Sequence, residues 1–259
     1  MQTWSDEQLK AGVETKTYYT AAGEYAAERQ ALHDALVDQE LEGHQPAPPP
    51  RLTLRSGGTA SGKTAAAKAA RSATPDCVYA NTDEFRAQLP EFPLVEGTDK
   101  AGLLQEEAGD IRDQLLAEAV ASSLNIVWDA PGSLWVADYL QEIERLGYQV
   151  TIAYTHRPVD EAKRAAARRA ATASNPADRR VVPDAVIDGS HRKAREGFAA
   201  MARTGSREII VYDMTGKQPG EPADVIYHRE RSGHIRVYDR AAVQRFAAGR
   251  PPIDETVFD

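Results

Sequence analysis

The sequence predicts an α/β fold in which helices cover both faces of a mainly parallel sheet, with an antiparallel hairpin at one edge. Short apolar, β-rich runs alternate with stretches of helical pattern between residues 51 and 212, and this alternation is typical of parallel sheets. A glycine-rich segment, 57–64, joins the first of these runs to an alanine-rich stretch. Two later β-rich runs, 224–227 and 234–238, are separated by glycine-bearing turns, which predicts the edge hairpin.

The individual elements follow from residue type and periodicity. Short runs rich in Val, Ile, Tyr and Trp and bounded by turn residues predict strands, whereas longer stretches with apolar residues three or four positions apart predict helices. In chain order, we expect strands at 51–54, 76–80, 125–128, 149–154 and 209–212, and helices at 65–70, 103–123, 136–146, 159–172 and 183–202.

The composition limits the classes of protein that this chain can belong to. Among its 259 residues, 42% are hydrophobic and 27% are charged, as in ordinary globular proteins, and no apolar run approaches the length of a membrane span. The N-terminus lacks the basic and apolar regions of a signal peptide, so we expect a cytoplasmic protein that does not bind a membrane. The net charge of −8 argues against a general nucleic-acid binder. The single cysteine, Cys77, lies in an apolar run and is expected to be buried, and the histidines show no metal-ligand spacing.

The strongest motif fills the pattern GxxxxGK[ST] completely. It lies between a predicted strand and a predicted helix, the context in which backbone N–H groups of the loop hold phosphate. Lys63 is expected to reach the β- and γ-phosphates of a nucleoside triphosphate, and the Thr64 hydroxyl to bind Mg²⁺. The alternative is a glycine-rich surface turn that matches by chance. The expected ATP-binding residues are Gly57, Gly58, Thr59, Ala60, Ser61, Gly62, Lys63 and Thr64.

The chain divides before this P-loop. Residues 1–46 read as helical and mostly polar, and Ala26, Leu32, Leu36 and Val37 give the stretch 25–41 a partial apolar stripe. The proline-rich segment QPAPPP that follows cannot continue a helix. We therefore expect a helical N-terminal extension over 1–50, packed on the core or covering it as a lid, and a P-loop kinase domain over 51–259.

Two aspartates follow predicted strands, where ligands of parallel sheets bind. Asp83 follows the strand that neighbours the P-loop strand in many mononucleotide kinases, and it could accept a proton from an attacking hydroxyl. Alternatively, Asp83 only caps the next helix. Arg86 is close to it in sequence and suits a phosphate or carboxylate ligand. Asp129 ends another strand, as an acid that supports Mg²⁺ does, or else it is a turn residue before a proline.

Seven cationic residues lie between positions 157 and 180. We assign Lys163 and Arg164 to a solvated helix face and expect at least one arginine of each pair, 168/169 and 179/180, to face phosphate, because phosphoryl transfer needs cations around the migrating group. Nucleic-acid binding is the lesser interpretation, since no aromatic residues are interleaved. The cationic residues are Arg157, Lys163, Arg164, Arg168, Arg169, Arg179 and Arg180.

Taken together, these segments resemble the zeta-toxin family of P-loop kinases. The resemblance covers about residues 50–215, and a segment at 23–33 also resembles some members. The segments that carry it are GGTASGKT (57–64), NTDEFRAQLP (81–90), EEAGDIRDQLLAEAV (106–120), VWDAPGS (127–133) and RRVVP (179–183). This chain departs from the family in having Asn81-Thr82 before the expected base, and Ala130-Pro131-Gly132 where threonine-glycine is frequent.

The resemblance implies a kinase that transfers the γ-phosphoryl group of ATP to the 3′-hydroxyl of a UDP-linked N-acetyl amino sugar, usually UDP-N-acetylglucosamine. It implies Asp83 as general base and Lys63 as phosphate clamp, with an antitoxin as a possible partner. Residues 1–46 are an alternative inhibitor. The remaining implied residues are Glu107 and Glu118 around the sugar nucleotide, Arg180 at the transferring phosphate, and Arg168, or in its place Arg169, as its partner.

Two other functions remain open from the sequence. The same scaffold could phosphorylate another acceptor, such as an antibiotic, a nucleotide or a dinucleotide. A nucleotide-dependent regulator without transfer chemistry is less favoured, because every expected catalytic position holds a suitable residue.

Overall fold

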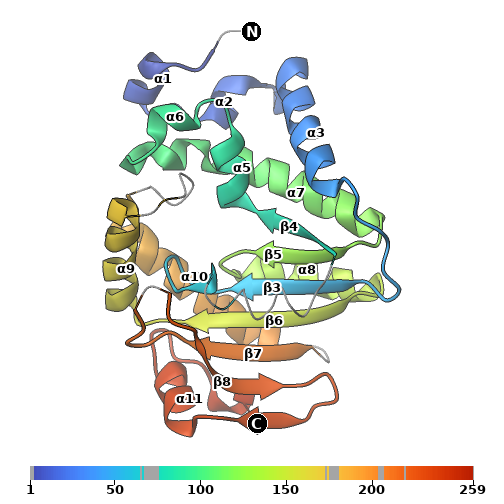
Figure 1. Ribbon diagram of the computed structural model, residues 1–259, viewed down its shortest axis with the longest axis vertical. Coiled ribbons are helices and arrows are strands. Elements are labelled where there is room, and N and C mark those ends of the chain that lie inside the picture. The colour runs from blue at the N-terminus through green and yellow to red at the C-terminus, as the bar shows by residue number, and fades with distance from the viewer. Residues whose placement is uncertain are drawn as a thin grey trace.

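The fold is built around a seven-stranded sheet of order β4-β5-β3-β6-β7-β8-β9 (Figure 1). The computed structural model describes residues 3–64, 66, 76–172, 174, 181–203, 207–218 and 220–258. The strands are β3 (Arg51–Ser56), β4 (Cys77–Asn81), β5 (Asn125–Asp129), β6 (Gln149–His156), β7 (Glu208–Asp213), β8 (Asp224–Arg229) and β9 (Ile235–Val237).

The sheet has the predicted mixture of strand directions. Strands β4, β5, β3, β6 and β7 are parallel, and β8 and β9 add an antiparallel hairpin at one edge, as expected. We had expected β4 to lie next to the P-loop strand β3, but β5 lies between the two strands. The strand β4 is thus an edge strand, and Cys77 at its start is half-buried rather than buried.

Helices lie on both sides of the sheet, with α8 and α10 behind it in the view of Figure 1, so the predicted fold class is confirmed. The helix α9 has the predicted bounds, whereas the helix predicted from residue 103 begins with a 3₁₀ turn, η1. The helix predicted at 65–70 lies, apart from Ala66, outside the described residues. The helices after β4 are α5 (Thr82–Gln88), α6 (Phe92–Val95), η1 (Asp99–Leu104), α7 (Gln105–Ala121), α8 (Leu134–Arg145), α9 (Val159–Thr172) and α10 (Asp184–Arg203).

The chain begins with helices that share the main hydrophobic core. Trp4, Tyr19 and Val37 are buried in the same cluster as the apolar side chains of α7, and α3 packs against α7. The buried stripe of α3 consists of Arg29, His33 and Val37, while Ala26 is exposed, because a buried ion-pair network takes part of the face that the apolar pattern predicted. The N-terminal elements are α1 (Asp6–Ala11), α2 (Thr15–Tyr19), β1 (Thr20–Ala21), β2 (Glu24–Tyr25) and α3 (Ala27–Leu41).

Two short elements close the C-terminal end of the chain, α11 (Arg240–Ala247) and η3 (Glu255–Phe258), and the sequence pattern did not predict them. Their Phe246 and Phe258 rings pack with Phe198 of α10 and Tyr154 of β6, which fixes α10 against the sheet. In the described part of the chain, no helix has both the length and the apolar character that crossing a bilayer requires.

Candidate active site

The glycines of the P-loop are required by close neighbours. Gly57 has a φ of 139°, and a Cβ there would lie 2.5 Å from the carbonyl oxygen of Thr155 in β6. Gly62 has a φ of 100°, and its Cβ would lie 3.0 Å from the Met214 side chain after β7. The loop therefore lies between the carboxyl ends of β6 and β7, where only a residue without a side chain fits at these two positions.

Lys63 is curled over this loop. Its ammonium group donates hydrogen bonds to the carbonyl oxygens of Gly57 and Gly58, at 3.0 and 3.3 Å, and lies 3.9 Å from Asp129. Burial lowers the pKa of Lys63, while the negative charges of Asp129 and Asp83 oppose that shift. A desolvated cation directed at backbone carbonyls is poised to exchange them for phosphate oxygens.

Asp129 belongs to a network that the sequence analysis missed. Arg55 of β3 lies 3.3 Å from its carboxylate, and Tyr79 of β4 donates a hydrogen bond to it at 3.3 Å. Arg55 also donates to the Tyr79 hydroxyl at 2.6 Å. Burial, and then the charge of Asp129, raise the pKa of Tyr79, so its hydroxyl stays protonated. The signal for this network was an arginine inside a buried strand, Arg55, directly opposite Asp129 in the register.

Asp83 lies at the start of α5, but another residue caps that helix. Asn81 accepts the capping hydrogen bond from the Asp83 backbone N–H, so the interpretation of Asp83 as only a helix cap was wrong. Its side chain is 34% exposed and accepts a hydrogen bond at 2.9 Å from Arg86, which is itself fully buried. Gln105 also accepts from Arg86, at 2.8 Å. The buried Arg86 therefore fixes the orientation of the Asp83 carboxylate, and part of that carboxylate stays accessible to solvent.

The two glutamates of α7 have different environments. Glu107 is fully buried, and Arg29 and His33 of α3 bind its carboxylate. Burial alone would raise the pKa of Glu107, but hydrogen bonds with His33 and Arg29 outweigh it and lower the pKa to about 2. Glu118 is half-buried and accepts a hydrogen bond from Gln114. Among the described residues, no hydrogen bond or ion pair joins either glutamate to the P-loop.

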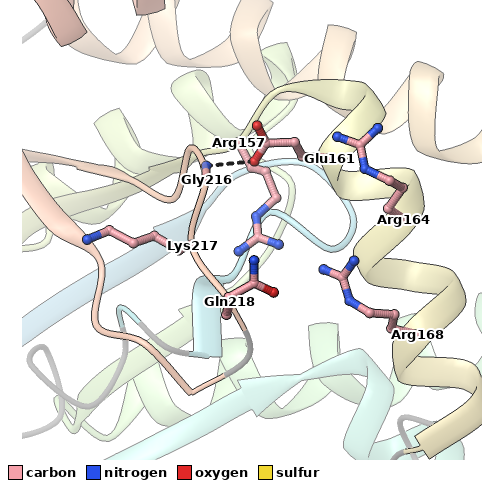
Figure 2. A pocket seen from close by; sticks show the side chains of 7 residues that line it. All are labelled: Arg157, Glu161, Arg164, Arg168, Gly216, Lys217 and Gln218. Atoms are coloured by element: carbon pink, nitrogen blue, oxygen red, sulfur yellow. Dashed lines mark hydrogen bonds between the residues drawn. The ribbon is translucent and has the colours of Figure 1, made fainter.

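A pocket rich in arginine opens beside the P-loop (Figure 2). Figure 2 shows the guanidinium groups of Arg157, Arg164 and Arg168 directed into the same space. Two lining residues, Arg157 and Gly216, lie two positions after Thr155 and Met214 in the sequence. Thr155 contacts Gly57 of the P-loop, and Met214 contacts Gly62. The space has a volume of about 170 Å³ and is lined by Arg157, Glu161, Arg164, Arg168, Gly216, Lys217 and Gln218.

The arginines predicted at the site divide between the pocket and the P-loop. Arg168 lines the pocket, whereas the charge of Arg169 acts on Lys63 and lowers its pKa. Arg164, which we had assigned to a solvated face, is exposed and also lines the pocket, while Lys163 pairs with acidic residues of α10. Arg179 and Arg180 lie outside the described residues.

A comparison with protein-family models decides the family. The model described as "Zeta toxin" matches residues 34–245, which is most of the chain. The chain belongs to the zeta-toxin family. A search of curated proteins finds no match. Membership of the zeta-toxin family implies a phosphotransferase with a P-loop, in agreement with the arrangement of Lys63, Asp83 and Asp129.

Solved structures support the fold of this zeta-toxin chain. The complex AvrRxo1-ORF1:AvrRxo1-ORF2 with sulphate ions superposes with a TM-score of 0.65 at 17% identity, covering 90% of this chain and 81% of that one. The same complex with ATP gives a TM-score of 0.62 at 17% identity, with coverage of 94% and 77%. A structure of the PezAT chromosomal toxin-antitoxin system of Streptococcus pneumoniae gives 0.58 at 15% identity, with coverage of 88% and 83%.

The zeta-toxin site offers oxygen ligands that suit Mg²⁺. The Thr64 hydroxyl and the Asp129 carboxylate are hard donors of the kind that Mg²⁺ binds. Asp129 is also held by Arg55 and approached by Lys63, so its charge is shared. Within the described residues, no three acidic, histidine or cysteine side chains gather as a metal cage. These donors fit a metal whose other ligands are phosphate oxygens and water.

Proposed function

We propose that this chain is an ATP-dependent kinase that phosphorylates the 3′-hydroxyl of a UDP-linked N-acetyl amino sugar, with UDP-N-acetylglucosamine as the acceptor. The proposal rests on three features that follow the carboxyl ends of the parallel strands: the P-loop, the Asp83 carboxylate held by Arg86, and the arginines of the pocket. The choice of acceptor rests on family membership.

In the proposed reaction, Asp83 removes the proton from the acceptor hydroxyl as its oxygen attacks the γ-phosphorus. The new O–P bond forms while the bond to the β-phosphate oxygen breaks, and ADP leaves. Lys63, Arg169 and Arg180 stabilise the charge on the migrating group. Arg169 takes this role instead of Arg168, because its charge acts on Lys63 whereas Arg168 lines the neighbouring pocket. Arg86 is proposed to keep the Asp83 carboxylate directed at the acceptor, since its guanidinium is fixed by burial and by Gln105.

The arginine pocket is proposed to hold the nucleoside end of ATP. Its lining begins two residues beyond Thr155 and Met214, which contact the P-loop glycines, and we propose that a nucleotide whose phosphates lie in the loop extends into it. Guanidinium groups stack on purine rings and pair with phosphate oxygens, and Arg157 and Arg168 provide both possibilities. Thr64 and Asp129 would hold Mg²⁺, which would supply positive charge against the phosphate oxygens.

The acceptor contacts of Glu107 and Glu118 remain proposals. Glu107 can contact an acceptor only if Arg29 and His33 release its carboxylate, because it is fully buried in their network. Glu118 is half-buried and does not depend on such a release.

We also propose a cytoplasmic protein that is silenced by an antitoxin. One similar structure comes from the PezAT chromosomal toxin-antitoxin system, which supports this partner. Inhibition by residues 1–46 is less favoured, since Trp4, Tyr19 and Val37 are buried in the common core. Deleting 1–46 is therefore expected to unfold the chain rather than to raise its kinase activity.

The test is a coupled assay of ATP consumption with Mg²⁺ and UDP-N-acetylglucosamine, followed by mass spectrometry of the sugar nucleotide. We expect the gain of one phosphate, and its loss in Asp83→Asn with ATP affinity retained. Consumption of ATP with an unmodified sugar nucleotide would refute this acceptor and lead to antibiotics, nucleotides and dinucleotides. A biological effect that survives Asp83→Asn would favour a regulator without transfer chemistry.

A further inference from the structure

The first turns of α10 contact the tip of the P-loop. The Thr59 backbone N–H donates to the Ser190 hydroxyl oxygen at 2.9 Å, and His191 Nε2 lies 3.0 Å from the Thr59 carbonyl oxygen. Both backbone groups of one loop residue are thus bound by adjacent residues that are more than 130 positions away in the sequence.

The donors and acceptors in this contact are fixed by chemistry. The Ser190 hydroxyl donates to the Ile187 carbonyl oxygen at 2.9 Å, which leaves its lone pairs for the Thr59 N–H. A carbonyl only accepts, so His191 must carry its proton on Nε2. His191 is 5% exposed, and burial lowers its pKa; the hydrogen bond to Thr59 opposes this shift, and the charge of Lys63 adds to it. A neutral imidazole with its proton on Nε2 satisfies this arrangement.

Steric contacts reinforce the hydrogen bonds. A Cβ at Gly58 would lie 2.2 Å from the His191 ring, so the ring packs directly on the loop backbone. Ala60 has a φ of 58°, a conformation that alanine rarely adopts and that needs support from its surroundings. That support comes from a small apolar cluster around Ile187 of α10.

The same cluster joins α10 to the helix that carries the arginines. Ala162 and Ala166 of α9 are buried with Ile187, and Ala60 of the P-loop packs against them. Positions 187, 190 and 191 lie on one face of α10, because residues three and four apart are neighbours on a helix. One helical face therefore contacts both the P-loop and α9.

We propose that Ser190 and His191 are positioning residues for the nucleotide: they hold the P-loop in its phosphate-binding shape and in register with the arginines of α9. The inference rests on the proposed binding of ATP at this loop. It assigns no contact between either side chain and the ligand, since both act through the Thr59 backbone.

The experiment measures MgATP affinity of the full chain by calorimetry for the wild type, Ser190→Ala, His191→Leu and His191→Gln. Glutamine can place an amide N–H near the position of Nε2, whereas leucine cannot. Leaving the partly buried Thr59 carbonyl without a donor is expected to weaken ATP binding about tenfold in His191→Leu, and His191→Gln should stay within about threefold of the wild type. Ser190→Ala is expected to weaken binding about fivefold.

A matched control is Arg192→Ala on the exposed face of the same helix, where the side chain pairs only with Glu196 among the described residues. It should bind ATP like the wild type. In steady-state kinetics, His191→Leu should raise the KM for ATP and leave the KM for the acceptor unchanged, a split that general destabilisation would not produce.

Wild-type affinity in both Ser190→Ala and His191→Leu would overturn the inference while leaving the proposed function intact. Equal losses of ATP affinity in His191→Gln and His191→Leu would also overturn it, because the hydrogen bond to Thr59 would then contribute nothing to ATP binding. If His191→Leu does not fold, Ser190→Ala decides, since it removes a single oxygen. A wild-type chain that binds no ATP would overturn the proposed function together with this inference.

Discussion

Two buried arginines, Arg29 and Arg157, have opposite surroundings. Arg29 is 1% exposed and donates hydrogen bonds to two buried carboxylates, those of Glu91 and Glu107. Burial would lower the pKa of Arg29, but these hydrogen bonds raise it. Arg157 is 5% exposed, burial lowers its pKa, and within the described ranges its Nε has no hydrogen-bond partner. The nearby carboxylate of Glu161 accepts from the Gly216 backbone N–H instead.

This difference in pairing distinguishes an arginine that stabilises the fold from one that is available to bind a ligand. A buried charge is tolerated when it is paired and hydrogen-bonded, and Arg29 meets that condition within the chain. Within the described part of the chain, Arg157 is not hydrogen-bonded in this way. The charge of Glu161 favours its protonated form, but burial and the like charge of Arg168 disfavour it, so its pKa is lowered. An anion from outside would complete the balance. We call a cation closed when carboxylates of the chain pair with it, as with Arg29, and open when it is left for an external anion, as with Arg157. The first three predictions test this assignment for a lysine and two arginines, and the fourth extends it to a histidine.

The largest effect is expected at Lys63, an open cation. Lys63→Met should lower kcat/KM by about 10³–10⁴-fold, equivalent to about 4–5.5 kcal/mol of transition-state stabilisation, because the migrating phosphoryl group loses its clamp. Urea unfolding should show no loss of stability. Lys163→Met, which removes a surface ion pair, is the control and should retain activity. A parallel loss of stability in Lys63→Met would contradict its assignment to the site.

The closed arginine should behave in the reverse way. Arg29→Met removes the cation shared by two buried carboxylates, which then keep hydrogen bonds from His33 and Tyr19. It is expected to lower the free energy of unfolding by about 3–5 kcal/mol, measured by urea denaturation. Lys16→Met removes a partly exposed ion pair with Asp110 on the same helix α7, so it should cost at most about 1 kcal/mol. Similar costs for the two variants would mean that the Arg29 network adds little to stability.

For the open arginine, affinity and stability should change independently. Arg157→Met should weaken ATP binding by about 1–3 kcal/mol, or roughly 5–150-fold, and leave the free energy of unfolding unchanged or higher. Calorimetry with MgATP and urea denaturation of the same preparation measure both quantities. Arg240→Met on exposed α11 is the control. Unchanged ATP affinity would place the nucleoside of ATP outside the arginine pocket.

The smallest effect concerns His156, a half-buried side chain that is neutral instead of being charged and paired. Burial lowers the pKa of His156 to about 4, although Asp213 opposes the shift. The neutral ring contributes stability that is present above pH 6.5, the unfolded value, and is lost as the pH falls through 4. At pH 5 the loss is about 2 kcal/mol relative to pH 7.5. His156→Gln should reduce the difference in unfolding free energy between these pH values by about this amount, and an unchanged difference would contradict the shift.

Local patterns predicted the strands of the sheet, most of its helices and the motif, but not the partners that complete the site. Helix α9 and the parallel strands follow from periodicity, and the P-loop follows from eight contiguous residues. Arg55 was missed because its partner Asp129 is brought opposite it by strand register, 74 positions away along the chain. Ser190 and His191 were missed because helix packing alone places them on the loop.

The same reasoning explains the apolar stripe predicted for α3. Its spacing gave the helix correctly, yet the buried positions include Arg29 and His33, whose polar partners lie on α7 and before α6. A periodicity argument treats charged residues as exposed, so it fails where charges neutralise each other inside the core.

The contact of α10 with the P-loop also bears on how the protein is made. The ribosome delivers Thr59 well before Ser190, which is 131 residues later, an interval of roughly 7–26 s at about 5–20 residues per second. During that time the growing chain carries the GGTASGKT segment without the helix that supports it. A nascent or truncated chain therefore has the complete motif but not the complete loop, and the enzyme matures only when its last third has emerged.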